Sequence, residues 1–165
     1  DSSNLKENSK INYSNRFNTI LVQDSDNINF NKKNFRVVSK KKPSNELLNK
    51  LIFAFNVCRN VKSNAIVITK DYKTVGIGSG QSSRLDSCKI AIDKMKKFQR
   101  STEDDDLLAA SDAFFPFVDG LETLVQAGVT GVIQPSGSKN DKEIIKFANQ
   151  TGTVLVFSHT RHFNH

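Results

Sequence analysis

Cysteine and histidine are scarce in this 165-residue sequence, and those present form no recognisable ligand pattern. The two cysteines, Cys58 and Cys88, occupy apolar helical positions outside any C-x-x-C pair, so we expect both to be reduced and packed. The three histidines, His159, His162 and His165, are crowded at the end of the chain. Without Cys and His at ligand spacing, the sequence predicts that no zinc is bound.

Long apolar runs are absent as well. No segment approaches the roughly 18–20 apolar residues that a membrane-spanning helix needs, and residues 1–10 are too polar for a signal peptide. With 37% hydrophobic and 25% charged residues, the composition is that of an ordinary soluble domain. The length fits a single unit of about 100–200 residues. We therefore expect a cytoplasmic protein without a membrane partner.

The net charge of +7 is concentrated in one part of the chain. Residues 1–62 hold 12 Lys and Arg against 5 Asp and Glu, whereas residues 63–165 hold 12 of each. A basic, Asn- and Ser-rich segment of this kind is typical of a solvated face or linker, because a nucleic-acid surface would also need an aromatic platform or a reading helix. We predict no nucleic-acid partner; the alternative would be binding to random DNA or RNA that weakens steeply with salt.

The pattern of helices and strands predicts an α/β domain that begins near Phe35. Residues 1–34 are polar and indicate a leader or a partly extended linker. Periodicity and end signals predict helices at 45–59, from 84 onward, just before Gly128, and at 141–150. Runs of β-branched residues predict strands at 65–69, 74–78, 130–133 and 154–157, the first two forming a hairpin. This alternation favours a three-layer α/β sandwich.

Two loops carry residues that core packing does not need. Residues 62–64 (Lys-Ser-Asn) precede a buried-type strand, where an amide can donate and accept hydrogen bonds, although asparagine there is also a common turn residue. Residues 76–84 bring small residues to a helix start, where the backbone can approach a ligand and free N–H groups can bind an anion. A glycine turn of this kind can equally be structural.

Two further segments combine aromatic and charged residues. Residues 111–117 place adjacent phenylalanines and a proline beside an aspartate, and such rings either pack under the core or stack on a flat heterocycle. Residues 160–165 contain Arg161, whose guanidinium could hold a phosphate or carboxylate unless the segment is a frayed tail.

Taken in order, five motifs of this chain resemble those of one family, the bifunctional AICAR transformylase/IMP cyclohydrolases. They are KSNAIV, VGIGSGQSSRLDS, SDAFFPF, IQPSGS and RHFNH, and the similarity covers about residues 18–165, starting with LVQD at 21–24. The resemblance implies the C-terminal half of the transformylase domain. Residues 35–165 would form its second cytidine-deaminase-like subdomain, without the zinc signature of true deaminases, and residues 1–34 would lead in from the preceding subdomain.

The resemblance implies a folate-dependent formyl transfer in purine biosynthesis. In the family, 10-formyltetrahydrofolate formylates the 5-amino group of AICAR, and the cyclohydrolase domain closes the product, FAICAR, to IMP. The family's Lys-His pair, in a KHxNPxG-like motif of the first subdomain, has no counterpart here, and neither has the cyclohydrolase domain. The implied partners are AICAR, folate, the missing N-terminal half of the enzyme and a second copy in a homodimer. The isolated chain is expected to be inactive.

The resemblance also assigns roles to single residues. Asn64 would lie at the reacting groups and orient the formyl oxygen or AICAR. AICAR would contact Arg84, Phe114 and Arg161. The folate side would be lined by Leu85, Pro116, Phe117 and Asp119, although Val118 replaces an arginine common in the family. A potassium-type cation would take oxygens around Ser63 and Asp112 and backbone carbonyls near the C-terminus, where Asn164 replaces a common histidine.

A non-catalytic module is the alternative. The same loops would then bind a nucleotide or a second protomer without turnover, and a half-domain could fold and dimerise in this way.

Overall fold

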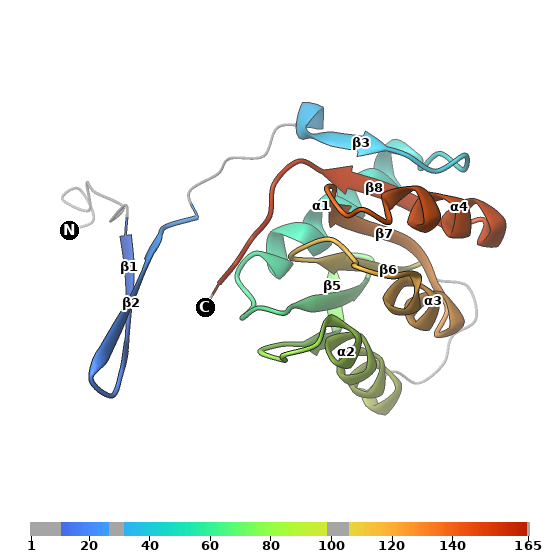
Figure 1. The fold of residues 1–165 in the computed structure, drawn as a ribbon. Helices are drawn as coiled ribbons and strands as arrows, with labels where there is room; N and C mark the ends of the chain where they lie inside the picture. The colour runs from blue at the N-terminus through green and yellow to red at the C-terminus, as the bar shows by residue number, and fades with distance from the viewer. Residues whose placement is uncertain (1–10, 27–31, 99–105, 165) are drawn as a thin grey trace, which may run out of the picture. The chain divides into compact units, whose positions relative to one another are not determined.

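The computed structural model describes residues 11–26, 32–98 and 106–164, which fall into two units (Figure 1). In the first unit, β1 (Ile11–Arg16) pairs antiparallel with β2 (Thr19–Asp24). This hairpin lies where the sequence indicated a linker. The rest of the predicted 1–34 leader falls partly on residues 1–10 and 27–31, which are outside the described residues.

The second unit contains a mixed six-stranded sheet in the order β3-β8-β7-β6-β4-β5. The central strands β6, β7 and β8 are parallel, whereas β4 is antiparallel to both neighbours and β3 is antiparallel to β8. The strands are β3 (Phe35–Val37), β4 (Ile66–Lys70), β5 (Lys73–Gly78), β6 (Leu107–Ser111), β7 (Val129–Pro135) and β8 (Val154–Ser158). A short 3-10 helix, η2 (Lys32–Asn34), precedes β3.

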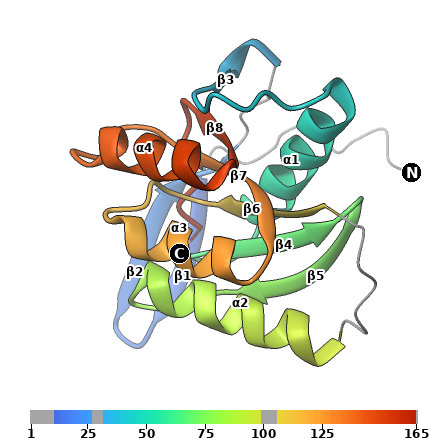
Figure 2. The same cartoon turned by 90° about the vertical axis from the view of Figure 1, so that its right-hand side faces the viewer.

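Helices cover both faces of this sheet (Figure 2). They are α1 (Asn45–Cys58), α2 (Arg84–Phe98), α3 (Val118–Gln126) and α4 (Asp141–Thr151). One face packs against α1, and the other against α2, α3 and α4, which adjoin one another in that order. The fold is therefore α/β with a mixed central sheet, as expected, and its layering is compatible with the predicted three-layer sandwich. Among the described helices, none combines the length and apolar character needed to cross a bilayer.

Local signals account for where the helices begin and end. The Ser44 hydroxyl accepts from the N–H of Leu47 at 3.1 Å and caps α1. Gly152, with φ of 66°, ends α4 in the left-handed conformation that glycine adopts without strain. The four predicted helices and the four predicted strands are confirmed. The pattern did not predict β1, β2, β3 or β6.

The missed strand β6 has a physical explanation. Its sequence, LLAAS, contains no β-branched residue, so its intrinsic preference for a strand is weak. It is nevertheless hydrogen-bonded to β4 on one side and β7 on the other, and Leu108, Ala109 and Ala110 are fully buried. Tertiary pairing therefore outweighs local propensity here.

Candidate functional site

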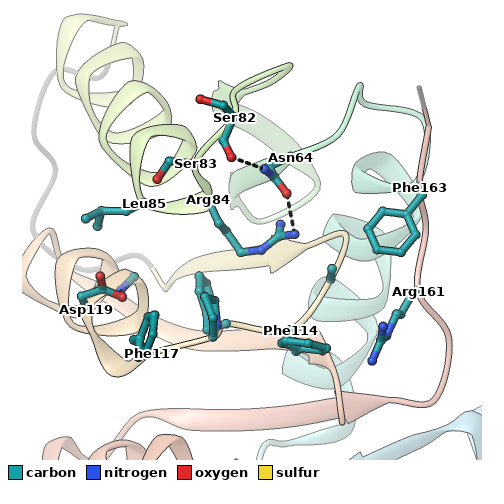
Figure 3. A pocket seen from close by; sticks show the side chains of 14 residues that line it. Asn64, Ser82, Ser83, Arg84, Leu85, Phe114, Phe117, Asp119, Arg161 and Phe163 are labelled. Carbon is teal, nitrogen blue, oxygen red and sulfur yellow. Dashed lines mark hydrogen bonds between the residues drawn. The ribbon is translucent and has the colours of Figure 1, made fainter. Parts of the chain in front are cut away.

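A pocket of about 530 Å³ lies in the second unit (Figure 3). Its walls come from the segment before β4, the start of α2, the loop after β6, the start of α3 and the C-terminal segment. All the residues proposed from the family resemblance for catalysis, AICAR and folate lie in its lining, namely Asn64, Arg84, Leu85, Phe114, Pro116, Phe117, Asp119 and Arg161. Ser63 and Asp112, proposed for a cation, are outside the lining but bonded to each other at 2.5 Å.

Arg84 links the pocket to the buried interior. Its Nη2 donates to Asn64 Oδ1 at 2.8 Å (Figure 3), and its Nη1 donates to Ser111 Oγ at 3.2 Å and pairs with Asp112 Oδ1. Asp112 is fully buried. A buried carboxylate without a partner would be strongly unfavourable, so the guanidinium explains how this aspartate is accommodated.

The amide of Asn64 is oriented by several protein contacts. Its Nδ2 donates to the main-chain oxygens of Gln81 and Ser82, at 2.9 and 3.1 Å, while Oδ1 accepts from Arg84. Ser87 on α2 donates its hydroxyl to the Asn64 carbonyl at 2.8 Å. Both N–H bonds of the Asn64 side chain are thus engaged. The hydrogen-bonding capacity that remains for a ligand is the second lone pair of Oδ1. The geometry therefore favours acceptance of an N–H from a ligand over donation to an oxyanion.

Several oxygen atoms gather behind the pocket, around Ser63 and Asp112. Ser63 Oγ donates to Asp112 Oδ2, and the Ser63 N–H donates to the carbonyl of Asn164 at 2.8 Å. The N–H of His162 donates to the main-chain oxygen of Asp112 at 2.9 Å. These bonds tie the C-terminal segment to the end of β6. Within the described ranges, no group of three or more His, Cys, Asp or Glu side chains could hold a metal ion.

The aromatic segment divides between the core and the pocket. Phe115 is 1% exposed and belongs to the core, whereas Phe117 is 63% exposed. The Arg161 guanidinium lies over the Phe114 ring, 4.5 Å from its centroid. Phe115 therefore packs under the core, as one interpretation of the sequence expected, and it also borders the pocket together with Phe114 and Phe117. Stacking of these rings on a flat heterocycle stays a prediction.

Asp119 stands in the first turn of α3, where the helix dipole favours a negative charge. Its Oδ1 accepts from the N–H of Gly120 at 2.7 Å, and the side chain lies at the opposite end of the pocket from Arg161 (Figure 3).

The thiols are not candidates for nucleophilic chemistry. Both cysteines are free and buried, as the sequence predicted. Burial raises the pKa of the Cys88 thiol to about 12 and the pKa of Cys58 well above its ordinary value. Both side chains are therefore neutral near pH 7, and a neutral thiol is a poor nucleophile.

Residues 2–94, more than half of the chain, match the model of the AICARFT/IMPCHase bienzyme family. The chain belongs to this family. It is 48% identical over 151 residues to the bifunctional purine biosynthesis protein PurH of Bartonella henselae, and 45% identical over 153 residues to that of Bradyrhizobium diazoefficiens. The PurH protein of Synechocystis sp. is 46% identical over 145 residues. The matches to these relatives cover 88% of the chain but only 27–28% of each relative.

Sequence reasoning missed some of the residues that line the pocket of this member of the AICARFT/IMPCHase family. Phe163 lines the pocket beside Arg161, and its presence in the RHFNH motif was the available signal. Ser82 and Ser83 also line the pocket, within the glycine-rich loop that the sequence singled out only as a whole. Neither histidine nor lysine occurs among the described lining residues.

Proposed function

We propose that this chain supplies the nucleotide- and folate-binding half of an AICAR formyltransferase active site, in a PurH-type enzyme that also carries IMP cyclohydrolase activity. One observation carries the proposal: the residues expected to contact AICAR and folate come from separate segments and converge on one pocket. The names of the relatives support purine biosynthesis. The enzyme would act in the cytoplasm as a homodimer.

The proposed chemistry is formyl transfer from 10-formyltetrahydrofolate. The AICAR 5-amino nitrogen attacks the formyl carbon, the bond from that carbon to folate N10 breaks, and a proton passes from the amine to folate. The amine is a poor nucleophile, because its lone pair is drawn toward the ring and the carboxamide. A proton acceptor and donors to the oxyanion are therefore needed. The described pocket lining contains no histidine or lysine, so we assign these roles to the family's Lys-His pair.

Within this scheme, the chain's own residues bind and orient the substrates. Asn64 accepts an N–H of AICAR with its free Oδ1 lone pair, and Arg84 holds that oxygen in place. Phe114 stacks on the heterocycle, and Arg161 holds the phosphate by a charge-assisted contact. On the folate side, Leu85, Pro116 and Phe117 cover the pterin, and Asp119 accepts from its amino-pyrimidine edge.

A potassium-type cation fits the oxygen cluster behind the pocket. Ser63 Oγ, Asp112 Oδ2 and the main-chain oxygen of Asn164 are hard donors of the kind such an ion takes. Ser63 Oγ is bonded to Asp112 Oδ2, and the Asn164 oxygen accepts from the Ser63 main-chain N–H. Arg84 balances the charge of Asp112, which favours a monovalent ion over a divalent one. Such an ion would stabilise the junction between the C-terminal segment and β6.

The non-catalytic alternative has one observation in its favour: the described pocket lining contains no histidine or lysine. Such a module would bind a nucleotide or a second protomer without turnover, whether or not the rest of the enzyme were present.

The test is kinetic and uses the full-length enzyme that contains this chain. We expect Asn64→Ala to lower kcat more than it raises the KM for AICAR, because the amide acts at the reacting centre. Arg161→Ala should chiefly raise the KM for AICAR, corresponding to about 2–3 kcal/mol, because a phosphate contact serves ground state and transition state alike. Steady-state kinetics of both variants decide this. The same KM-only pattern in both would demote Asn64 to a nucleotide-positioning residue, and no formylation by the wild-type enzyme would favour the module.

A further inference from the structure

Two amide side chains hold the aromatic segment 113–117 from the neighbouring β7–α4 region. Gln134, near the end of β7, is fully buried, and its Oε1 accepts from the N–H of Phe115 at 2.9 Å. Asn140, immediately before α4, donates from Nδ2 to the carbonyl of Pro116 at 2.5 Å. The two bonds therefore lie on either side of the Phe115–Pro116 peptide bond.

The surroundings of Gln134 point to its oxygen as the functional atom. Its Nε2 is buried and has no hydrogen-bond partner in the part of the chain that the structure describes. A buried donor without a partner is unfavourable, and an apolar side chain of similar size would not have one. The amide at this position is therefore explained by its bond to Phe115.

The backbone of the segment needs such partners. Pro116 has no N–H, and the buried N–H of Phe115 requires an acceptor. The rings differ in burial: Phe115 is packed in the core and only borders the pocket, whereas Phe114 is half-buried and Phe117 is exposed in the pocket lining. A slip of one residue would exchange a core ring for a pocket ring, so the position of the backbone decides which rings face a ligand.

We propose that Gln134 and Asn140 are positioning residues that clamp the aromatic segment, so that Phe114 and Phe117 meet the ligand in the correct register. The clamp itself is independent of ligand chemistry, whereas its effect on folate affinity rests on the proposed formyltransferase function. Neither side chain lines the pocket.

Two variants separate this role from a general structural one. Gln134→Met keeps the side-chain length but removes the acceptor. Its control is Gln126→Met, at an exposed glutamine on α3 whose side chain donates to Glu122. Asn140→Asp keeps the shape but removes the donor. It also places a carboxylate at the N-terminus of α4, where the helix dipole favours it, so overall stability should not fall. Its control is Asn149→Asp, because Asn149 Oδ1 accepts from the Lys40 N–H and aspartate preserves that bond.

The first measurement is hydrogen exchange of segment 113–117 in this chain. We expect the Phe115 amide to exchange about tenfold faster in Gln134→Met, and the amides of the segment to exchange faster in Asn140→Asp. The rest of the chain, and both control variants, should exchange at the wild-type rate. Wild-type exchange of the segment in both variants would overturn the clamp. If Gln134→Met does not fold, the exchange of Asn140→Asp alone decides whether the clamp exists, because the Asn140 side chain is not in the core.

The second measurement uses the full-length enzyme. We expect the KM for 10-formyltetrahydrofolate to rise about tenfold in either variant while kcat stays within about twofold, because binding geometry is lost and not the reacting groups. An unchanged KM beside faster exchange would refute the ligand-positioning role. A wild-type enzyme without formyltransferase activity would refute the proposed function and the inferred folate effect together, and the exchange result would still decide whether the clamp exists.

Discussion

At the scale of single residues, Arg84 connects the candidate site to the stability of the fold. Its side chain is 9% exposed and contacts Asn64 on the pocket side and Asp112 on the interior side. Buried ion pairs contribute little net stability when complete, but breaking one leaves a charge that is neither solvated nor paired. The same side chain that orients the Asn64 amide is therefore also required to bury Asp112.

We expect Arg84→Met to lower the free energy of unfolding by about 3–5 kcal/mol, because the buried Asp112 carboxylate loses its charged partner. Arg84→Met combined with Asp112→Asn should recover much of this loss, since the buried charge is removed. Urea denaturation of the wild type, Arg84→Met, Asp112→Asn and the double variant completes a double-mutant cycle. Additive effects of the two substitutions would show that the pair is not coupled.

At the scale of elements, β5 and α2 pack backbone against backbone, and this contact sets the position of the pocket wall. A Cβ at Gly78 would lie 1.9 Å from the carbonyl of Ser87, and one at Gly76 would lie 2.1 Å from that of Ala91. Both contacts are with main-chain atoms, which cannot rotate away. The glycines thus allow α2 to lie close enough to the sheet for Arg84, in its first turn, to reach Asn64.

Replacing Gly78 with alanine should therefore push α2 away from β5, at a cost of about 3 kcal/mol or more in unfolding free energy. Gly152→Ala is the matched comparison: its Cβ would meet nothing within 4 Å, so only the left-handed backbone conformation is strained, at about 1–2 kcal/mol. Thermal or chemical unfolding measures both. Equal losses would mean that steric contact with α2 is not what excludes a side chain at Gly78.

At the scale of the whole molecule, the described hydrophobic core lies entirely in the second unit. The hairpin β1–β2 has little of its own to bury: Tyr13 is 71% exposed, Ile20 66% and Val22 54%. An isolated two-stranded hairpin is only marginally stable in water. The two units therefore contribute very unequally to stability.

Removal of residues 1–30 should consequently leave the melting temperature within about 2 °C of that of the whole chain, because the described core belongs to the second unit. Calorimetry or circular dichroism would measure the shift. A clearly lower melting temperature would show that the N-terminal residues stabilise the α/β unit.

The chain by itself should show no measurable AICAR formylation, because the family's Lys-His pair is absent and each acid–base group contributes about 10²–10⁴-fold to such reactions. A formylation assay on the purified chain, with the full-length enzyme as the positive control, makes the comparison. Turnover at a rate near that of the full-length enzyme would disprove the assignment of the chemistry to the missing half.

Local signals were sufficient for much of the fold. The Ser44 cap, the Gly152 stop and the spacing of apolar residues marked the helices, since these interactions involve neighbours within one or two helical turns. The β-branched run of β4 likewise marked a strand. Where local preference was weak, as in the Ala- and Leu-rich β6, only pairing with distant strands decided the structure.

The sequence by itself determined the family, through its motifs, and with it a list of residues expected to meet at one site. Tertiary structure alone decided their geometry: which lone pair of Asn64 remains free, which phenylalanine enters the core, and which side chain neutralises Asp112. The reason is physical. The partners that orient these groups lie 17 to 49 residues away along the chain, and hydrogen-bond direction and burial are set only when the folded backbone brings them together.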